Sequence, residues 1–391
     1  MKSKLFLLSL VALTLAFTAC NKNQDEPQQS ETDATISVAV KSADLRAYED
    51  GAGDADKKVQ KLAVMVYQGG AQVAFKEVTD GSLEVKDIET TAGAKTLVVV
   101  ANYANQNLKG LSLDKVKALT HTLSADDQDP NKGTFMLTAE PVAVTLQKGK
   151  NYYGYEAGAD NRISVDEPIE LKHIHAGMAL TNLTVKFADS YANLYSVNFK
   201  KGELIGLVAK AQSNVFGESL VNTNADYFYG VKLFGKTDGK YTPAEANYKE
   251  MAALKMALTE TGAQTGKGFY VLENNDAKHP TILCLKGELT QADGTALTDE
   301  QAAQAVDAGW IVSTTDHSTY YPVLVNWEKD GYTFEGTTDK NGIVRNNKYE
   351  ISLTITGPGT NSPEDPTAEK ANLDVKCTVL PWVIVKQNVV W

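Results

Sequence analysis

Arginine is scarce in this 391-residue chain: it occurs only as Arg46, Arg162 and Arg345, whereas the other 35 of the 38 basic residues are lysine. The formal net charge is −11, so the chain lacks the excess of basic residues that binding to nucleic-acid phosphates requires. Nucleic acid is therefore excluded as a partner. A protease that requires arginine would also find few sites in this sequence.

Histidine is scarce too, with five residues, of which only His173 and His175 are close together. At this spacing they would face the same side of a strand, where they could supply two ligands of a metal site. No further ligand cluster accompanies them, so the sequence predicts no metal and no cofactor. The stretch DDQDPNKGTFML, with Asp127, imitates a calcium loop, but Lys132 replaces the glycine and Thr138 the glutamate of such a loop. We expect a solvated turn there.

Motifs of catalysis are absent. The chain has no GxSxG elbow, no Walker loop and no GxGxxG after a strand, and its carboxylates fall in no pattern that assigns an acid and a base. The sequence therefore predicts that the protein is not an enzyme, and a secreted hydrolase is an alternative without positive support. The 17 tyrosines fit sugar stacking or cross-strand packing, and packing is favoured.

The first 20 residues, MKSKLFLLSLVALTLAFTAC, have the pattern of a secretory signal peptide. Their apolar core is too short to cross a membrane as a helix. The ending FTAC resembles a bacterial lipobox, in which the cysteine, here Cys20, becomes the lipidated N-terminus. The polar stretch 21–33 is typical of a tether. The two remaining cysteines, Cys284 and Cys377, either pair in the oxidising compartment or stay as buried thiols.

Most of the chain after the tether alternates between apolar and polar residues, as β-strands do. In residues 33–41 the alternation places Ile36, Val38 and Val40 on one side. Residues 61–78 are predicted to form two strands around a glycine pair, because paired glycines supply the positive φ of a tight hairpin. Helical spacing predicts short helices over residues 111–123, 247–258 and 297–310, the last with a capping box from Thr298 to Gln301.

The two ends of this β-rich chain suggest one mechanism. Arg46 follows the 33–41 strand in the place where an exposed loop is expected, and a cut there would detach the tether together with that strand. Residues 373–391 carry apolar side chains mostly at odd positions, and Pro381 interrupts them. A strand from one molecule can complete the sheet of another, and repetition gives a filament because donor and acceptor surfaces differ. The donor residues are expected to be Val379, Trp382, Val383, Ile384, Val385, Val389 and Trp391.

Several segments, in this order, resemble one family of pilins from end to end. They are TAC at the lipobox, ATISVAVK, KLAVMVY, TLVVVAN, MLTAEP, FYVLEN, HPTILC, YYPVLVN, YEISLTITGPGTN and the tail that ends in tryptophan. On these segments the chain resembles FimA-type fimbrillin, the major subunit of type V fimbriae.

The resemblance implies a mainly β fold of two transthyretin-like β-sandwich domains with short helical insertions. It also implies a lipoprotein precursor, lipidated at Cys20 and carried to the outer membrane. An Arg-specific maturation protease would cut between Arg46 and Ala47, and donor-strand exchange would then polymerise the protein into fimbriae. The expected segments are a signal peptide (1–20), a propeptide (21–46), an N-terminal domain (47–168), a C-terminal domain (169–370) and a donor segment (371–391).

The partners implied by the resemblance are other copies of the chain, minor fimbrial subunits and an anchor, and host extracellular proteins in adhesion. The alternative is a monomeric outer-membrane surface lipoprotein that binds glycans or host proteins. Retention of the lipidated N-terminus would favour this alternative, whereas loss of residues 21–46 from the mature protein would oppose it.

Overall fold

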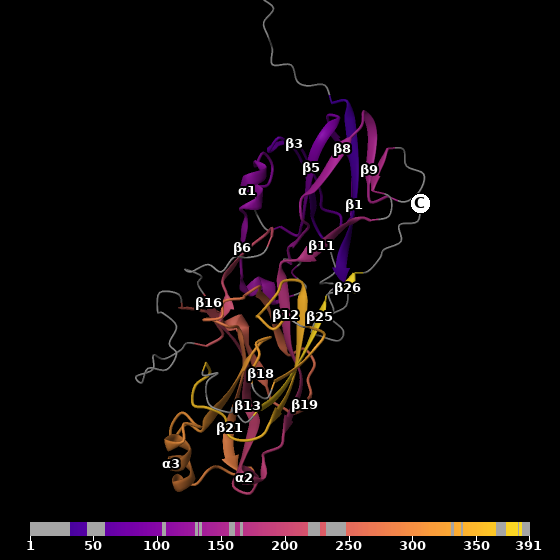
Figure 1. Ribbon diagram of the computed structural model, residues 1–391. Coiled ribbons are helices and arrows are strands. Elements are labelled where there is room, and N and C mark those ends of the chain that lie inside the picture. The colour runs from indigo at the N-terminus through magenta and orange to yellow at the C-terminus, as the bar shows by residue number, and fades with distance from the viewer. Residues whose placement is uncertain are drawn as a thin grey trace, which may run out of the picture.

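The structure is a computed structural model, and it describes residues 32–44, 59–103, 107–129, 132, 135–155, 161–164, 167–217, 227–231, 248–329, 332–337, 339–364, 373–381 and 383–384. The molecule is elongated and mainly β, as predicted. Its first half, the described residues from 32 to 173, lies at the top of Figure 1, and its second half, those from 175 to 381, lies at the bottom.

The first half is built around one large sheet with the strand order β10-β9-β1-β11-β7-β5-β2-β3, to which β4, β8 and β26 are attached. Its elements are β1 (Ala34–Asp44), β2 (Leu62–Gln68), β3 (Ala71–Val78), β4 (Glu84–Thr90), β5 (Gly93–Ala101), α1 (Leu113–Lys117), β6 (Thr120–Thr122), the 3₁₀ helix η1 (Ala125–Gln128), β7 (Leu137–Thr138), β8 (Val142–Leu146), β9 (Gly149–Tyr153), β10 (Arg162–Ser164) and β11 (Ile169–His173).

The second half contains a six-stranded sheet, β19-β12-β24-β25-β23 with β20 beside β12, and a four-stranded sheet, β18-β13-β21-β22. Its elements are β12 (His175–Val185), α2 (Asp189–Ala192), β13 (Tyr195–Leu207), β14 (Ala209–Lys210), β15 (Gln212–Asn214), β16 (Tyr227–Tyr229), β17 (Tyr248–Glu250), η4 (Ala252–Leu254), β18 (Lys255–Leu258), β19 (Gly262–Ala263), β20 (Gly268–Leu272), β21 (Ile282–Gln291), α3 (Asp299–Asp307), β22 (Ser318–Leu324), β23 (Tyr332–Glu335), β24 (Asn347–Ile355) and β25 (Leu373–Pro381), and β26 (Val383–Ile384) follows.

Short sequence patterns correctly predicted two local features, the turn between β2 and β3 and the start of α3. Gly69 and Gly70, with φ of 56° and 85°, form the two-residue turn between β2 and β3, because glycine reaches positive φ without a steric penalty. Helix α3 begins at the predicted capping box, in which the amide of Gln301 donates to Thr298 Oγ1 over 3.2 Å. Both predictions are confirmed.

Two helix predictions need correction. Of the expected helix over residues 247–258, the described residues 248–258 form β17, the 3₁₀ helix η4 and β18 instead of an α-helix, because β18 pairs with β13 and the amide of Met251 donates to the carbonyl of Tyr229. These tertiary strand pairings outweigh helix propensity. Of residues 111–123 only Leu113–Lys117 is helical, and Thr120–Thr122 is a strand that pairs with β15 of the second half.

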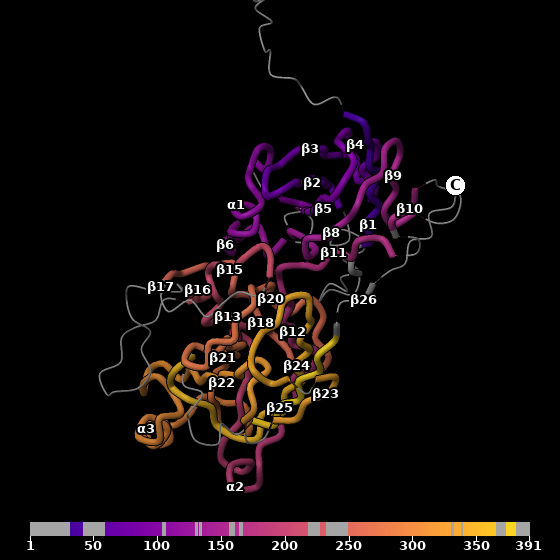
Figure 2. Tube along the Cα trace, turned by 45° about the horizontal axis from the view of Figure 1, so that its top comes forward, coloured from indigo at the N-terminus to yellow at the C-terminus, as the bar shows by residue number. Residues whose placement is uncertain are grey.

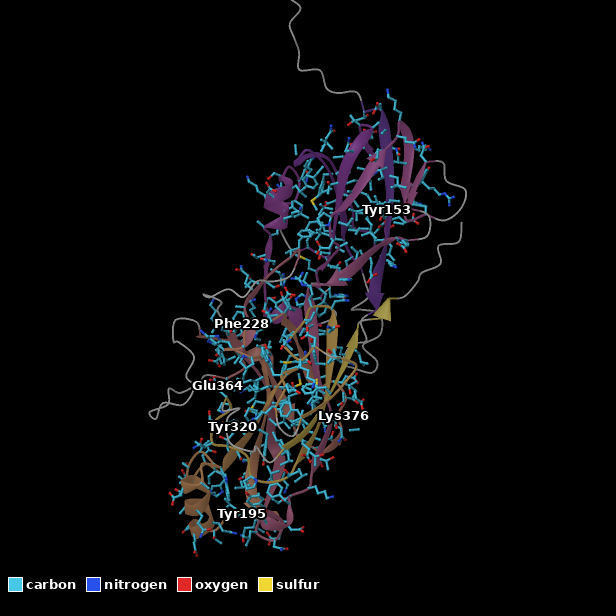
Figure 3. All side chains as sticks on the ribbon, in the orientation of Figure 1. Tyr153, Tyr195, Phe228, Tyr320, Glu364 and Lys376 are labelled. Carbon is cyan, nitrogen blue, oxygen red and sulfur yellow. The ribbon has the colours of Figure 1, made fainter. Side chains whose placement is uncertain are left out.

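Each half has its own apolar core. Ile36, Leu62 and Leu97 belong to that of the first half, and Leu204, Leu285 and Ile351 to that of the second. Tyr195, labelled at the lower end of Figure 3, packs with Ala302 and Ala305 of α3 in a smaller core.

The expected domain boundary between residues 168 and 169 stays a prediction. β11, which starts at Ile169, is still hydrogen bonded within the first sheet, beside β1 and β7.

Cys284 and Cys377 are both buried free thiols in the second half. Within the described ranges, no helix combines the length and the apolar character needed to span a membrane.

Candidate assembly site at the first strand

β1 has partners along both of its sides. Residues 34–38 pair in parallel with β9, and residues 34–39 pair antiparallel with β4 (Figure 2). Further along, residues 40–42 pair in parallel with β11, and the amide of Val40 donates to the carbonyl of Leu83 over 2.9 Å. Removal of β1 would therefore leave unpaired backbone on several segments of the first half.

The three alternating residues of β1 point into the core, as the sequence predicted for one side of this strand. Ile36 and Val38 are fully buried and Val40 is 5% exposed. They pack in the same cluster as Leu62 of β2 and Leu171 of β11. Burial of an aliphatic side chain contributes about 1.5 to 3 kcal/mol, so this strand is an integral part of the first half's core.

Hydrogen bonds and an ion pair hold the beginning of β1 in place. Asp33 Oδ1 accepts a hydrogen bond of 2.8 Å from the amide of Ala92, and Asp33 Oδ2 lies 3.4 Å from Lys148 Nζ. The backbone hydrogen bond from Ala92, together with the charge of Lys148, lowers the pKa of Asp33. The side-chain amide of Asn151 donates to the carbonyl of Thr35 over 3.1 Å. Each of these contacts joins a residue that precedes Arg46, Asp33 or Thr35, to one that follows it.

The C-terminal segment divides at Pro381. β25 pairs antiparallel with β24 over its whole length, and Val379, opposite Tyr349, is 5% exposed. After Pro381, the backbone of Val383 and Ile384 pairs with the end of β1. The remaining predicted site residues lie outside the described residues. They are Cys20, Arg46, Ala47, Trp382, Val385, Val389 and Trp391.

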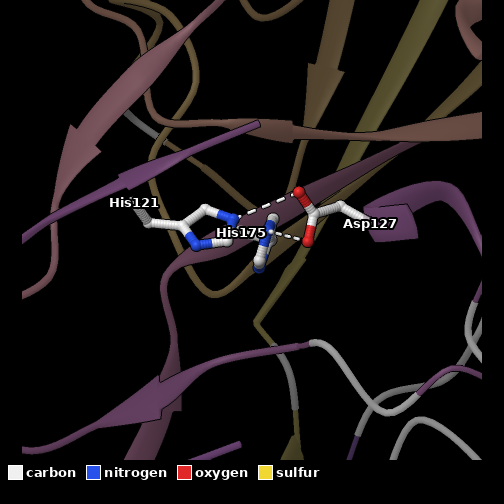
Figure 4. A group of neighbouring side chains, drawn as sticks. All are labelled: His121, Asp127 and His175. Atoms are coloured by element: carbon white, nitrogen blue, oxygen red, sulfur yellow. Dashed lines mark hydrogen bonds and ion pairs between the residues drawn. The ribbon is translucent and has the colours of Figure 1, made fainter. Parts of the chain in front are cut away.

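The structure also brings together three residues that are distant from one another in the sequence or were expected in different environments, namely His121, Asp127 and His175. The sequence predicts a solvated turn at Asp127 and groups only His173 with His175, yet Asp127 is fully buried and lies beside both His121 and His175 (Figure 4). His173 is buried but is not one of this group. The only local signal was the capping pattern from Ser124 to Asp127, because the histidines are far apart in sequence.

The molecule is mainly β and consists of two successive sheet units. β1 is paired on both sides in the first unit, and β25 lies in the six-stranded sheet of the second. This is the architecture of a fimbrial subunit. A crystal structure of a fimbrilin (FimA) from Porphyromonas gingivalis W83 matches 91% of this chain and 99% of its own, at 42% identity and a TM-score of 0.80. A putative cell adhesion protein from Parabacteroides distasonis shares the fold, with a TM-score of 0.65 at 24% identity, over 89% of this chain and 99% of its own.

The sequence comparisons agree with this architecture. Residues 34–173 match the family model "Major fimbrial subunit protein (FimA)", and residues 175–382 match "FimA4 pilin C-terminal domain". Major fimbrium subunit FimA type-3 of P. gingivalis is 47% identical, and type-4 is 45% identical, each over 100% of both chains. The chain belongs to the FimA family of major fimbrial subunits. It is a structural subunit of cell-surface fimbriae, and not an enzyme.

Proposed function

We propose that this subunit polymerises by protease-assisted donor-strand exchange into adhesive fimbriae. The observation that carries the proposal is the position of β1: it is paired on both sides and contributes Ile36, Val38 and Val40 to the core, yet it precedes Arg46. A single cut after Arg46 would separate this strand from the rest of the chain. Its departure would leave an apolar groove with unpaired backbone, which a strand from another copy would fill.

The placement of the arginines supports Arg46 as the cleavage site. Arg162 lies within strand β10. The guanidinium of Arg345 is largely buried, with Nε 2.8 Å from Glu273 Oε2 and a further hydrogen bond of 2.7 Å to the carbonyl of Asn214. A protease must draw an extended segment into its active site, which a paired strand or a buried ion pair resists. Arg46 is the arginine that follows β1 in the 45–58 connection.

The proposed donor is the segment 382–391. β25 already completes the second half's own sheet, so using Val379 as a donor residue would require it to leave that core. Ten extended residues span about 33 Å at about 3.3 Å per residue, and the seven residues 34–40 span about 23 Å. The tail beyond Pro381 is therefore long enough to replace the buried part of β1 in a neighbour.

The precursor is proposed to reach the outer membrane as a lipoprotein attached through Cys20. An Arg-specific protease would then release the subunit at the surface by the cut between Arg46 and Ala47. The proposed partners are further copies of this chain, minor fimbrial subunits with an anchor, and host extracellular proteins. The names of the relatives support the first of these, because a major fimbrium subunit is the repeated unit of its fimbrium.

The test is N-terminal sequencing of surface-extracted protein, combined with electron microscopy of the cells. Wild type is expected to begin at Ala47 and to form filaments, whereas Arg46→Ala is expected to stay lipidated and monomeric. A chain truncated after Pro381 is expected to mature but not to polymerise. Lys58→Ala, which removes a basic residue from the same connection, is the control and is expected to behave as wild type. Filaments from the truncated chain, or mature wild-type protein that begins at Cys20, would refute the proposal.

A further inference from the structure

Three potential metal ligands meet where the two halves join. His121 comes from β6, Asp127 from η1 and His175 from the first position of β12 (Figure 4). His121 Nε2 is 3.1 Å from Asp127 Oδ2, and His175 Nε2 is 3.5 Å from Asp127 Oδ1. One ligand atom from each residue can be chosen so that all lie within 4.8 Å of one another.

The cluster contains buried polar atoms without hydrogen bonds. Asp127 and His175 are fully buried, and Asp127 Oδ1 and both ring nitrogens of His175 have no hydrogen-bond partner among the described residues. The other carboxylate oxygen, Asp127 Oδ2, accepts from the amide and the hydroxyl of Ser124 over 2.7 and 3.0 Å. A buried polar atom without a partner is destabilising. Asp127 Oδ1 and His175 Nε2 face each other across 3.5 Å, and an ion bound between them would satisfy both.

We propose that His121, Asp127 and His175 bind a divalent transition-metal ion of the zinc type, with water as the fourth ligand. Two imidazole nitrogens and one carboxylate oxygen suit zinc, whereas calcium and magnesium prefer a shell of oxygens. Metal–ligand bonds of about 2.0 to 2.1 Å in a tetrahedron place the ligand atoms about 3.3 to 3.4 Å apart. Each imidazole lies near this distance from one of the two oxygens of Asp127: His121 Nε2 is 3.1 Å from Oδ2, and His175 Nε2 is 3.5 Å from Oδ1.

An ion at this place would join elements of both halves. β6 pairs with β15 of the second half, and Gln128, the neighbour of Asp127, exchanges two hydrogen bonds with the backbone of Tyr270 in β20. β6 and β12 lie in the middle of the long molecule (Figure 1). A metal bound to three separate segments would therefore stabilise the junction against separation of the halves. This inference does not depend on the route of polymerisation.

The test uses the purified full chain, stripped of metal with a chelator and then titrated with Zn²⁺ alone and with Co²⁺ alone. We expect one equivalent of each to bind and to raise the melting temperature, and bound Co²⁺ to show the visible absorption of a tetrahedral site. His121→Gln and Asp127→Asn are each expected to weaken binding by more than about tenfold, an effect at least as large as that of removing an outer-shell partner. His317→Gln, a substitution in an exposed loop, is the control and is expected to bind as wild type.

The Co²⁺ spectrum of the wild-type chain decides the question even if a variant fails to fold. Absence of stoichiometric binding to the wild-type chain would overturn the proposal, and the cluster would then be a buried histidine–carboxylate pair. Binding that survives in folded His121→Gln and Asp127→Asn would overturn it as well, because the ion would then be held elsewhere.

Discussion

The hydroxyl of Ser37 in β1 accepts a hydrogen bond of 3.0 Å from the backbone amide of Asp87 in β4. The register between these strands shifts at this point, from Ile36 opposite Ile88 to Val38 opposite Val85, and Asp87 has a φ of 48°. Such a bulge takes an amide out of the regular ladder. Ser37, which is itself buried, supplies the acceptor that this amide needs.

Ser37→Ala is therefore expected to destabilise the precursor by about 0.5 to 1.5 kcal/mol, because the amide of Asp87 would lose its acceptor in a partly buried place. Thermal unfolding of the precursor would measure the effect. Thr35→Ala changes a half-buried neighbour on the same strand and is the control, with a smaller expected loss. Equal losses of stability in the two variants would show that the hydrogen bond between Ser37 and Asp87 does not contribute to the stability of the precursor.

Ile36→Ala is expected to act on the precursor alone. Truncation of a fully buried isoleucine costs about 2 to 5 kcal/mol through lost burial and a residual cavity, so the precursor should melt at a lower temperature. If β1 leaves during maturation, filaments made from this variant should match wild type in thermal and denaturant stability.

Val64→Ala is the matched control for that experiment. Val64 lies in β2 of the same core and is fully buried, but it remains in the mature chain. Its substitution is expected to weaken both the precursor and the filament. Filaments weakened by Ile36→Ala as much as by Val64→Ala would mean that β1 stays in place.

Local sequence patterns sufficed for elements whose geometry is set by neighbouring residues. The glycine pair at 69–70 and the capping box at Thr298 each predicted the structure found, because turn and cap geometry depend on a few adjacent residues. The alternation in 33–41 likewise predicted a strand with Ile36, Val38 and Val40 buried. It could not show that partners flank both of its sides.

Features that depend on long-range contacts were missed. Residues 247–258 have a helical spacing, but β13 and Tyr229 supply strand partners that no local pattern reveals. The group of His121, Asp127 and His175 forms because β6 and η1 pack against the start of β12, across more than fifty residues of sequence. No spacing rule for metal ligands covers such a separation, so the sequence predicted a solvated turn at Asp127 instead.

The contribution of Asp33 should make precursor stability depend on pH. The hydrogen bond from Ala92, with Lys148 nearby, lowers the pKa of Asp33 in the folded state below its ordinary value of about 3.9. A lowered folded-state pKa means that the stabilisation is fully present above about pH 4 and is lost as the pH falls through the folded-state pKa. Acid should therefore loosen the beginning of β1.

Asp33→Asn isolates this charge, because asparagine keeps the size and an acceptor oxygen. The variant precursor is expected to melt below wild type at pH 6, and the difference should close as the pH falls below about 4. Melting curves of both precursors across this range would measure it. A difference that is constant or grows in acid would contradict the assignment.

Arg345 is expected to be the arginine on which stability of the second half depends. Its guanidinium donates to both oxygens of Glu273, to the hydroxyl of Ser213 and to the carbonyl of Asn214, the last two in β15. Arg345→Ala would leave the 7%-exposed Glu273 without its counter-charge, and breaking such a buried pair costs about 3 to 5 kcal/mol. Lys340→Ala removes an ion pair with the exposed Glu328 and should cost less than about 1 kcal/mol. Denaturant unfolding of both variants would measure the contrast, and equal small losses would show that solvent replaces the contacts of Arg345.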